Sequence, residues 1–175
     1  MNTTHLHLLL NHFPIIGTLM GCTLMLWGII KNQNNIKIAS SILLVLMAII
    51  AIPVYLTGEP AEESVEKLPG VLESMIELHE DAASLAIWLM GITGVSALMA
   101  LFLERQKSKI ATNAFLATFI FSIICFAAMA RTGYYGGQIR HTEINAGATT
   151  AVQQINSEKN PEGKENKKGK EKDDD

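Results

Sequence analysis

Long apolar runs without a charged residue dominate this chain. Asp, Glu, Lys and Arg are all missing from residues 1–30, 38–58, 82–103 and 110–130. A helix needs about 20 predominantly apolar residues to cross the hydrocarbon core of a bilayer, and each run provides that length. None of the runs alternates as a membrane strand does, and a helix pairs its backbone polar groups within the segment. The pattern predicts four transmembrane helices, over residues 10–30, 38–57, 80–103 and 110–131.

The connections between these spans complete the predicted fold. The segments after the first and third spans are short, so consecutive helices are expected to run antiparallel. Residues 68–78 combine apolar and acidic positions at a spacing that predicts a short helix on the membrane surface. Gly136 and Gly137, after the fourth span, predict a turn that folds the chain back. The expected fold class is all-α: a four-transmembrane-helix up-down bundle with a short interfacial helix between helices two and three.

The last part of the chain has a different composition. Residues 157–175 contain six Lys and seven acidic residues but no large apolar side chain. Such a segment cannot bury enough apolar surface to fold. We therefore expect a four-helix membrane domain over residues 1–143 and a polar, largely disordered tail over residues 144–175. The tail's charges nearly cancel, so we expect no nucleic-acid partner; the expected partner of the chain is the lipid bilayer.

Basic residues near the spans predict the orientation. Short loops rich in Lys and Arg favour the cytoplasmic side of a membrane. Five basic residues follow the first and third spans, namely Lys31, Lys37, Arg105, Lys107 and Lys109. Three lie near the membrane on the other side, namely Lys67, Arg131 and Arg140. The bias predicts that both termini lie outside the cytoplasm, and the first apolar run has no cleavage signal, so we expect it to be retained.

All histidines of the chain belong to one side of the predicted bundle. They are His5, His7, His12, His79 and His141. Imidazoles at membrane depth are usually functional and face the bundle interior or a watery cavity. His12 and His79 stand where the first and third spans enter the apolar layer, and these two helices lie diagonally across the core of an up-down bundle.

Two imidazoles that approach from opposite sides are typical axial ligands of haem iron. We therefore expect haem b, with His12 and His79 as the axial pair and with His7 and His141 as a second pair or as supporting residues. His7 precedes His12 by five residues, so the two face different directions on a straight helix. A non-helical lead-in to Pro14 is the alternative arrangement of His7.

The histidines also fit two alternatives to haem. Imidazole suits copper and zinc, so a non-haem metal site is the alternative cofactor. A single histidine near a membrane surface is more often an anchor than a ligand, and a structural or assembly subunit without a cofactor is the third interpretation. No nucleophile with an adjacent base, phosphate-binding loop or zinc-protease motif occurs in the sequence, so enzymatic turnover is not expected.

Small and sulfur-containing residues in the spans are interpreted mainly as packing. Gly17 and Gly21 form a small-xxx-small pattern that lets two helices approach closely, although glycine also clears room for a porphyrin. Gly91 and Gly94 carry the same two interpretations. The methionines are interpreted as ordinary filler of apolar helices and not as ligands, and Cys22 and Cys125 are expected to be inert small apolar residues.

The segment between the second and third spans is strongly acidic. Residues 59–81 contain eight acidic residues against one Lys. These charges form a solvated face or attract a cationic partner, such as a soluble c-type cytochrome, by long-range steering. Glu80 and Asp81 follow His79 directly and are candidates to accept its second ring N–H.

Four stretches together resemble a known family. They are the opening His7-Leu-Leu-Leu-Asn-His12-Phe-Pro14, the corner Thr57-Gly58-x-x-Ala61-Glu62, His79-Glu80 at the third span, and Gly136-Gly137-x-x-x-His141. Over about residues 5–143 the chain resembles the large bacterial family of small four-helix membrane proteins catalogued as domain of unknown function 2231. Members are sometimes found beside respiratory and cytochrome proteins, which implies redox work in the cytoplasmic membrane, alone or as a subunit of a respiratory complex. Leu8 stands where members usually have Pro, and the spacer before His141 is shorter than in many members.

Overall fold

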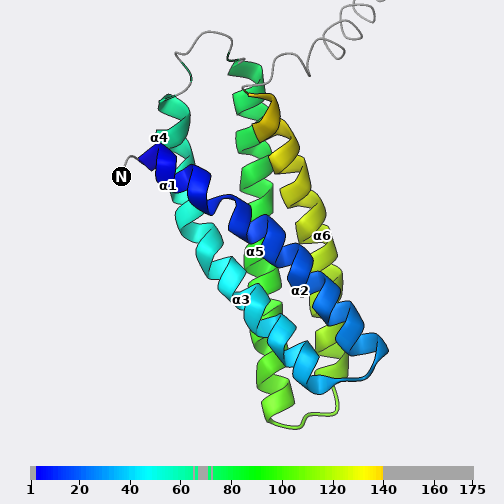
Figure 1. The fold of residues 1–175 in the computed structure, drawn as a ribbon. Helices are drawn as coiled ribbons and strands as arrows, with labels where there is room; N and C mark the ends of the chain where they lie inside the picture. The colour runs from blue at the N-terminus through cyan, green and yellow to red at the C-terminus, as the bar shows by residue number, and fades with distance from the viewer. Residues whose placement is uncertain (1–2, 65, 67–70, 72, 140–175) are drawn as a thin grey trace, which may run out of the picture. The chain divides into compact units, whose positions relative to one another are not determined.

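A computed structural model of the chain describes residues 3–64, 66, 71 and 73–139, and in these residues it contains helices and no strand (Figure 1). The helices in chain order are α1 (Thr3–Leu10), α2 (His12–Ile30), α3 (Asn34–Leu56), α4 (Gly58–Glu63), α5 (Glu73–Arg105) and α6 (Ala111–Gln138). Residues 144–175, expected to form a tail, lie outside the described residues. The all-α prediction is confirmed for the part of the chain that the structure describes.

Four segments are long and apolar enough to cross a membrane. They are Thr4–Ile30, Asn34–Leu56, Glu73–Arg105 and Ala111–Gln138. The first combines α1 and α2, which meet at Asn11, and the backbone N–H of Asn11 still donates to the carbonyl of His7 in the helical manner (2.9 Å). The lead-in to Pro14 is therefore helical, not irregular.

Two helices extend several residues beyond the predicted spans. The sequence predicts that the third span begins at residue 80, but α5 begins at Glu73. It predicts that the fourth span ends near residue 131 and meets a turn at Gly136 and Gly137, but α6 continues through both glycines to Gln138. Glycine in a helix interior costs roughly 0.5–1 kcal/mol relative to alanine. The ring of His79 in α5, which packs against Gly136, accounts for that glycine's place in the helix.

The expected surface helix over residues 68–78 is not present as a separate element in the described residues. Residues 68–70 and 72 lie outside them, and residues 73–78 form the first turns of α5. The short helix of this region is instead α4, which follows α3 after Thr57.

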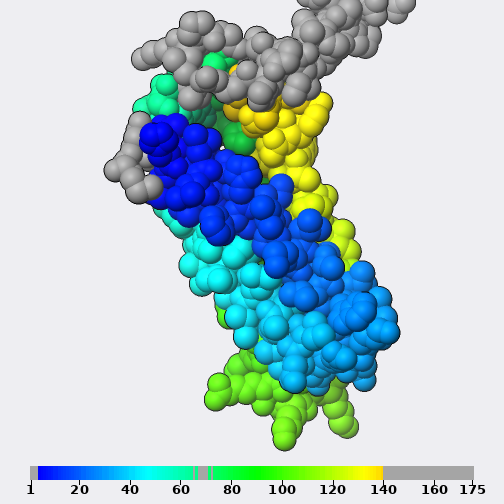
Figure 2. All heavy atoms as spheres, in the orientation of Figure 1, coloured from blue at the N-terminus to red at the C-terminus, as the bar shows by residue number. Residues whose placement is uncertain are grey.

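The four long helices form a ring of contacts. α2 packs against α3 and α6, and α5 packs against the same two helices. Figure 2 shows α1 and α2, in blue, lying against α3, in cyan, on one face of the protein. The ring encloses two apolar clusters, one around Met47, Met90 and Cys125, the other around Met25, Leu44 and Phe115.

Glycines provide the close contacts in this ring. A Cβ at Gly21 of α2 would lie 2.7 Å from Leu44 Cδ2 of α3, and a Cβ at Gly94 of α5 would lie 2.6 Å from Ala48 Cβ of α3. Gly17 meets Met47 in the same way. These contacts favour the close-packing interpretation of the glycine pattern, because only a residue without a Cβ lets the backbones approach so far.

Candidate histidine site

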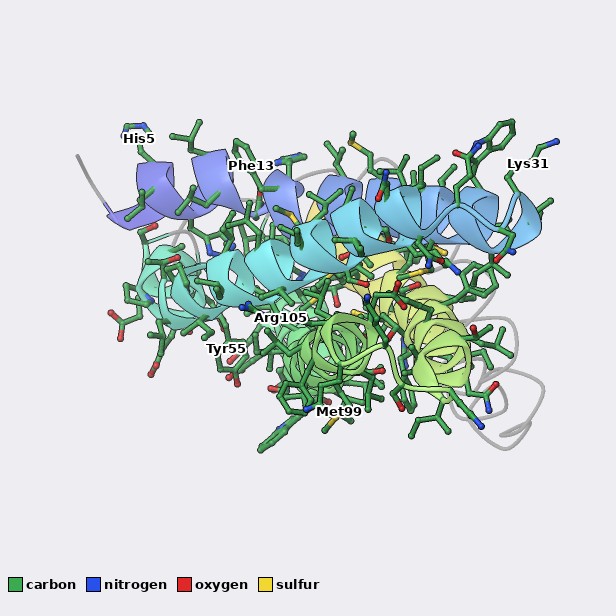
Figure 3. The ribbon with its side chains drawn as sticks, turned by 90° about the horizontal axis from the view of Figure 1, so that it is seen from below. His5, Phe13, Lys31, Tyr55, Met99 and Arg105 are labelled. Carbon is green, nitrogen blue, oxygen red and sulfur yellow. The ribbon has the colours of Figure 1, made fainter. Side chains whose placement is uncertain are left out.

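The described histidines gather at one end of the bundle. His5 and His7 lie in α1, His12 begins α2, and His79 lies in the second turn of α5. Figure 3 shows His5 and Lys31 at opposite ends of the first span, so the histidine end is the one away from the Lys31 hinge. His141 falls outside the described residues.

His7 is held by the end of α3. Its Nδ1 lies 3.0 Å from the carbonyl oxygen of Val54 and 3.3 Å from Oγ1 of Thr57. The side chain is half-buried, and its Cε1 lies 3.7 Å from the position that a Cβ at Gly58 would take. A carbonyl oxygen only accepts hydrogen bonds, so Nδ1 carries the proton when this bond is made.

His79 is held by α6 in a similar way. Its Nδ1 lies 2.9 Å from the carbonyl oxygen of Thr132, and its ring is half-buried. A Cβ at Gly136 would lie 2.9 Å from Cε1 and 3.0 Å from Nδ1 of this ring. The absence of a side chain at Gly136 is therefore what makes room for the imidazole against α6.

The two imidazoles share one region of the protein and one tautomer. Each donates Nδ1–H to a backbone carbonyl, so the neutral ring of each carries its lone pair on Nε2. Metal-binding histidines usually have this arrangement, in which the second nitrogen is tied to an acceptor that fixes the orientation of the ring. In both His7 and His79, the Nε2 lone pair is therefore available to bind a metal ion.

Asn11 adds an unsatisfied polar atom one helical turn from His7. Its Oδ1 is buried and has no hydrogen-bond partner among the described residues. Residues four apart lie on the same face of a helix, so Asn11 follows His7 on the inner face of the first span. A buried acceptor without a donor costs about 1–3 kcal/mol, which marks this place as one where a polar group from outside the chain would be accommodated.

His5 and His12 have different surroundings. Both side chains are exposed. The axial pair expected from the sequence is His12 with His79, but the histidine of the first span that is half-buried and tied to a neighbouring helix is His7. The expectation that His7 and His12 face different directions agrees with this placement.

The expected acceptors beside His79 are not the observed ones. Glu80 and Asp81 are exposed, and the Nδ1 of His79 is bonded to Thr132 instead. The physical reason is the helix itself, because consecutive residues point away from one another. No sequence pattern identifies the carbonyl groups of Val54 and Thr132 as partners, although the spacing of His7 and Asn11 does place a second polar side chain on the histidine face.

A cluster of acidic side chains, centred on Glu62 of α4, lies near the histidine end of the bundle. Burial raises the pKa of the Glu62 carboxyl in α4, and repulsion from Glu80, Glu66 and Glu59 raises it further. Glu80 lies in α5 and follows His79 directly in the sequence. Its repulsion of Glu62 means that the acidic side chains of α4 act on the first turns of α5.

Within the described ranges, no group of three or more His, Cys, Asp or Glu side chains is close enough to hold a metal ion. Among the described histidines, His7 and His79 are the half-buried ones at this end. Comparisons with protein-family models, with curated proteins and with solved structures find no match for this chain.

Proposed function

We propose that this protein is an integral membrane electron-transfer protein that holds haem b through His7 and His79. The observation that carries the proposal is that the two imidazoles have the same surroundings. Both are half-buried, and both donate an Nδ1–H hydrogen bond to a backbone carbonyl. The lone pair of Nε2 is therefore available to bind iron in each ring. When bound, haem iron supplies reversible one-electron transfer, and its axial ligands and surroundings tune the potential.

The number of available ligands favours haem over a bare metal ion. A structural zinc ion takes four protein ligands, and a catalytic one takes three. Haem needs only axial ligands from the protein because the porphyrin supplies the other four donors. Two imidazoles with available Nε2 atoms, and no group of three ligating side chains among the described residues, match the needs of haem better than those of zinc.

The remaining residues of the site would orient and space the ligands. Val54 and Thr132 fix the rotation of the two rings, Gly136 lets the His79 ring lie against α6, and Asn11 supplies a polar side chain one turn from His7. In neutral imidazole with Nδ1–H bonded to a carbonyl, the donor strength of Nε2 increases.

In the membrane, the four membrane-length helices would form an up-down bundle. We place it in the bacterial cytoplasmic membrane, with the histidine end and both termini outside the cytoplasm. The basic residues of the two short hinges support this orientation. The resemblance to the bacterial four-helix family supports the redox role. An electron donor or acceptor such as a c-type cytochrome or a respiratory complex would then approach the acidic face formed by Glu59, Glu62 and Glu66.

An absorption spectrum tests the function. Protein purified in mild detergent from haem-sufficient cells is expected to show a Soret band that shifts on reduction. His7→Ala and His79→Ala should each abolish the reduced-minus-oxidised signal of a bis-histidine haem, because each variant removes one of the two imidazoles that would hold the iron. The matched controls are His5→Ala and His12→Ala, which remove exposed imidazoles of the same span and should keep the signal.

The metal content of the wild type separates the alternatives. A wild-type protein without a Soret band overturns the haem proposal; stoichiometric zinc or copper in that protein would then establish the non-haem alternative, and metal-free protein the structural-subunit alternative. A signal that survives in His7→Ala but disappears in His12→Ala restores His12 as the partner of His79.

A further inference from the structure

The centre of the bundle contains a cluster of sulfur-containing side chains. Met90 of α5 and Cys125 of α6 are fully buried, and Met129 of α6 is 8% exposed. All three belong to one core cluster, together with Met47 of α3. We propose that Met90, Cys125 and Met129 form a binding site for a single Cu(I) ion.

Three short distances connect these sulfur atoms, one directly and two through a hydroxyl group. The Cys125 Sγ lies 3.5 Å from the Met90 Sδ. The hydroxyl of Thr18, from α2, lies 3.5 Å from Met90 Sδ and 3.7 Å from Met129 Sδ, so it bridges the two thioethers. Cys125 and Met129 are four residues apart and therefore share a face of α6.

The separation of the Met90 and Cys125 sulfur atoms suits a shared metal ion after a small adjustment. Two sulfur atoms that each lie roughly 2.3 Å from an ion, as in zinc–thiolate bonds, are about 4 Å apart in a trigonal arrangement. The separation of Met90 and Cys125 is 3.5 Å, so they need to move apart by only about half an ångström. Methionine makes such changes easily because its side chain is unbranched and has several rotatable bonds.

The chemistry of the donors selects Cu(I). Thioether and thiolate sulfur are soft ligands, and soft ligands prefer Cu(I) to hard cations. Binding replaces the proton of the Cys125 thiol: Cu⁺ and the thiol give a copper–thiolate bond and one released H⁺, with no change in oxidation state. The site then holds one positive and one negative charge and is neutral.

Neutrality is the second reason for a monovalent ion. Residues 38–58, 82–103 and 110–130 contain no Asp, Glu, Lys or Arg. A divalent ion bound by one thiolate would leave a net charge in this apolar core, and an uncompensated charge in a low-dielectric interior is costly. The copper site uses none of the histidines and does not depend on the proposed function.

Titration of the purified, reduced full-length protein with Cu(I) against a coloured Cu(I) chelator tests this site. We expect one Cu(I) per chain to resist the chelator. Met90→Leu and Cys125→Ala should each weaken binding at least about tenfold. Removal of a residue that only hydrogen-bonds to a metal ligand already costs about tenfold or more in affinity, and removal of the ligand itself should cost at least as much. The matched controls are Met99→Leu, an exposed methionine of the same helix, and Cys22→Ala; both should bind as the wild type does.

His7→Ala and His79→Ala separate the copper site from the haem site. They should leave Cu(I) binding unchanged, whatever they do to haem. X-ray absorption of the copper-loaded wild type requires no variant: a shell of sulfur atoms supports the site, and a shell of nitrogen or oxygen overturns it. Wild-type protein that loses all Cu(I) to the chelator, or a Met90→Leu Cys125→Ala double variant that still binds it, overturns it as well.

Discussion

The imidazole of His79 lies directly against Gly136 of the neighbouring helix. A Cβ at position 136 would come within 2.9 Å of Cε1 and 3.0 Å of Nδ1 of the ring, while Nδ1 is held 2.9 Å from the carbonyl oxygen of Thr132. The ring therefore makes two contacts with α6, one with Gly136 and one with the carbonyl group of Thr132. One glycine therefore sets the position of one histidine.

Gly136→Ala should displace the His79 ring. An added methyl group forces off-rotamer side chains or backbone shifts that typically cost about 1–3 kcal/mol. We expect a lower thermal midpoint in detergent and, under the proposed function, loss of the reduced-minus-oxidised haem signal.

The control for this change is Gly137→Ala. A Cβ at Gly137 would meet nothing within 4 Å. Because alanine has the higher helix propensity, by about 1 kcal/mol, this variant should be as stable as the wild type or more stable. Equal midpoints for the two variants would contradict the importance of the contact between His79 and Gly136.

A second pair of glycines tests the packing of α5 on α3. A Cβ at Gly94 would lie 2.6 Å from Ala48 Cβ, whereas a Cβ at Gly91 would have no neighbour within 4 Å. Gly94→Ala should separate the two helices and destabilise the fold by about 1–3 kcal/mol. Gly91→Ala should be neutral or stabilising. Reversible unfolding in mixed detergent measures both, and a Gly94→Ala variant as stable as Gly91→Ala would show that α3 and α5 pack differently.

Two adjacent serines of α3 make different kinds of hydrogen bond, one between helices and one within the helix. Ser40 donates to the carbonyl of Gly21 in α2 (2.7 Å), and Ser41 donates to the carbonyl of Lys37 in its own helix (2.9 Å). Both side chains are fully buried. Ser40→Ala should destabilise the contact between α2 and α3 by about 0.6 kcal/mol, the average for such bonds in a membrane protein.

Ser41→Ala is the matched control for Ser40→Ala, because it removes an equally buried hydroxyl without breaking a contact between helices. It should have the smaller effect on the free energy of unfolding. An effect of Ser41→Ala as large as that of Ser40→Ala would mean that the loss comes from packing and not from the bond to Gly21.

The acidic group at the histidine end predicts a pH dependence of stability. Burial and then repulsion from Glu80, Glu66 and Glu59 raise the pKa of Glu62 above its ordinary value of 4.5. The folded state therefore binds the proton more tightly than the unfolded state, so this group destabilises the fold at high pH. Stability should rise as pH falls through the raised pKa toward 4.5 and then gain nothing more from this group.

Glu62→Gln should remove this dependence and raise the thermal midpoint at neutral pH. The control is Glu63→Gln, a change at the next, exposed residue of α4. Thermal midpoints measured from mildly acidic to mildly alkaline pH check both variants. A wild-type midpoint that falls steadily with decreasing pH across this range, with Glu62→Gln parallel to it, contradicts this role of Glu62.

The membrane-length helices follow from the sequence alone, and so does the gathering of the described histidines at one end. Charge-free runs of about 20 residues have few alternatives to a helix in lipid, because lipid offers no hydrogen bonds to the backbone. The hinges after the first and third long helices are short and polar and contain no histidine. The described histidines instead lie at the start of the first and of the third long helix, and antiparallel neighbours bring these two starts to the same end. Both features depend on local stretches of sequence, which is why the pattern of apolar and polar positions predicts them.

Which histidines point inward was decided only by the tertiary structure. Because α1 continues helically toward α2, five residues turn the side chain by about 140°, so His7 faces inward and His12 does not. The partner of His7 at Val54 and the partners of His79 at Thr132 and Gly136 come from other helices, about 50 residues away along the chain. Backbone carbonyls and glycines have no side-chain pattern to mark such a role, so only the packing of the helices against one another could select them.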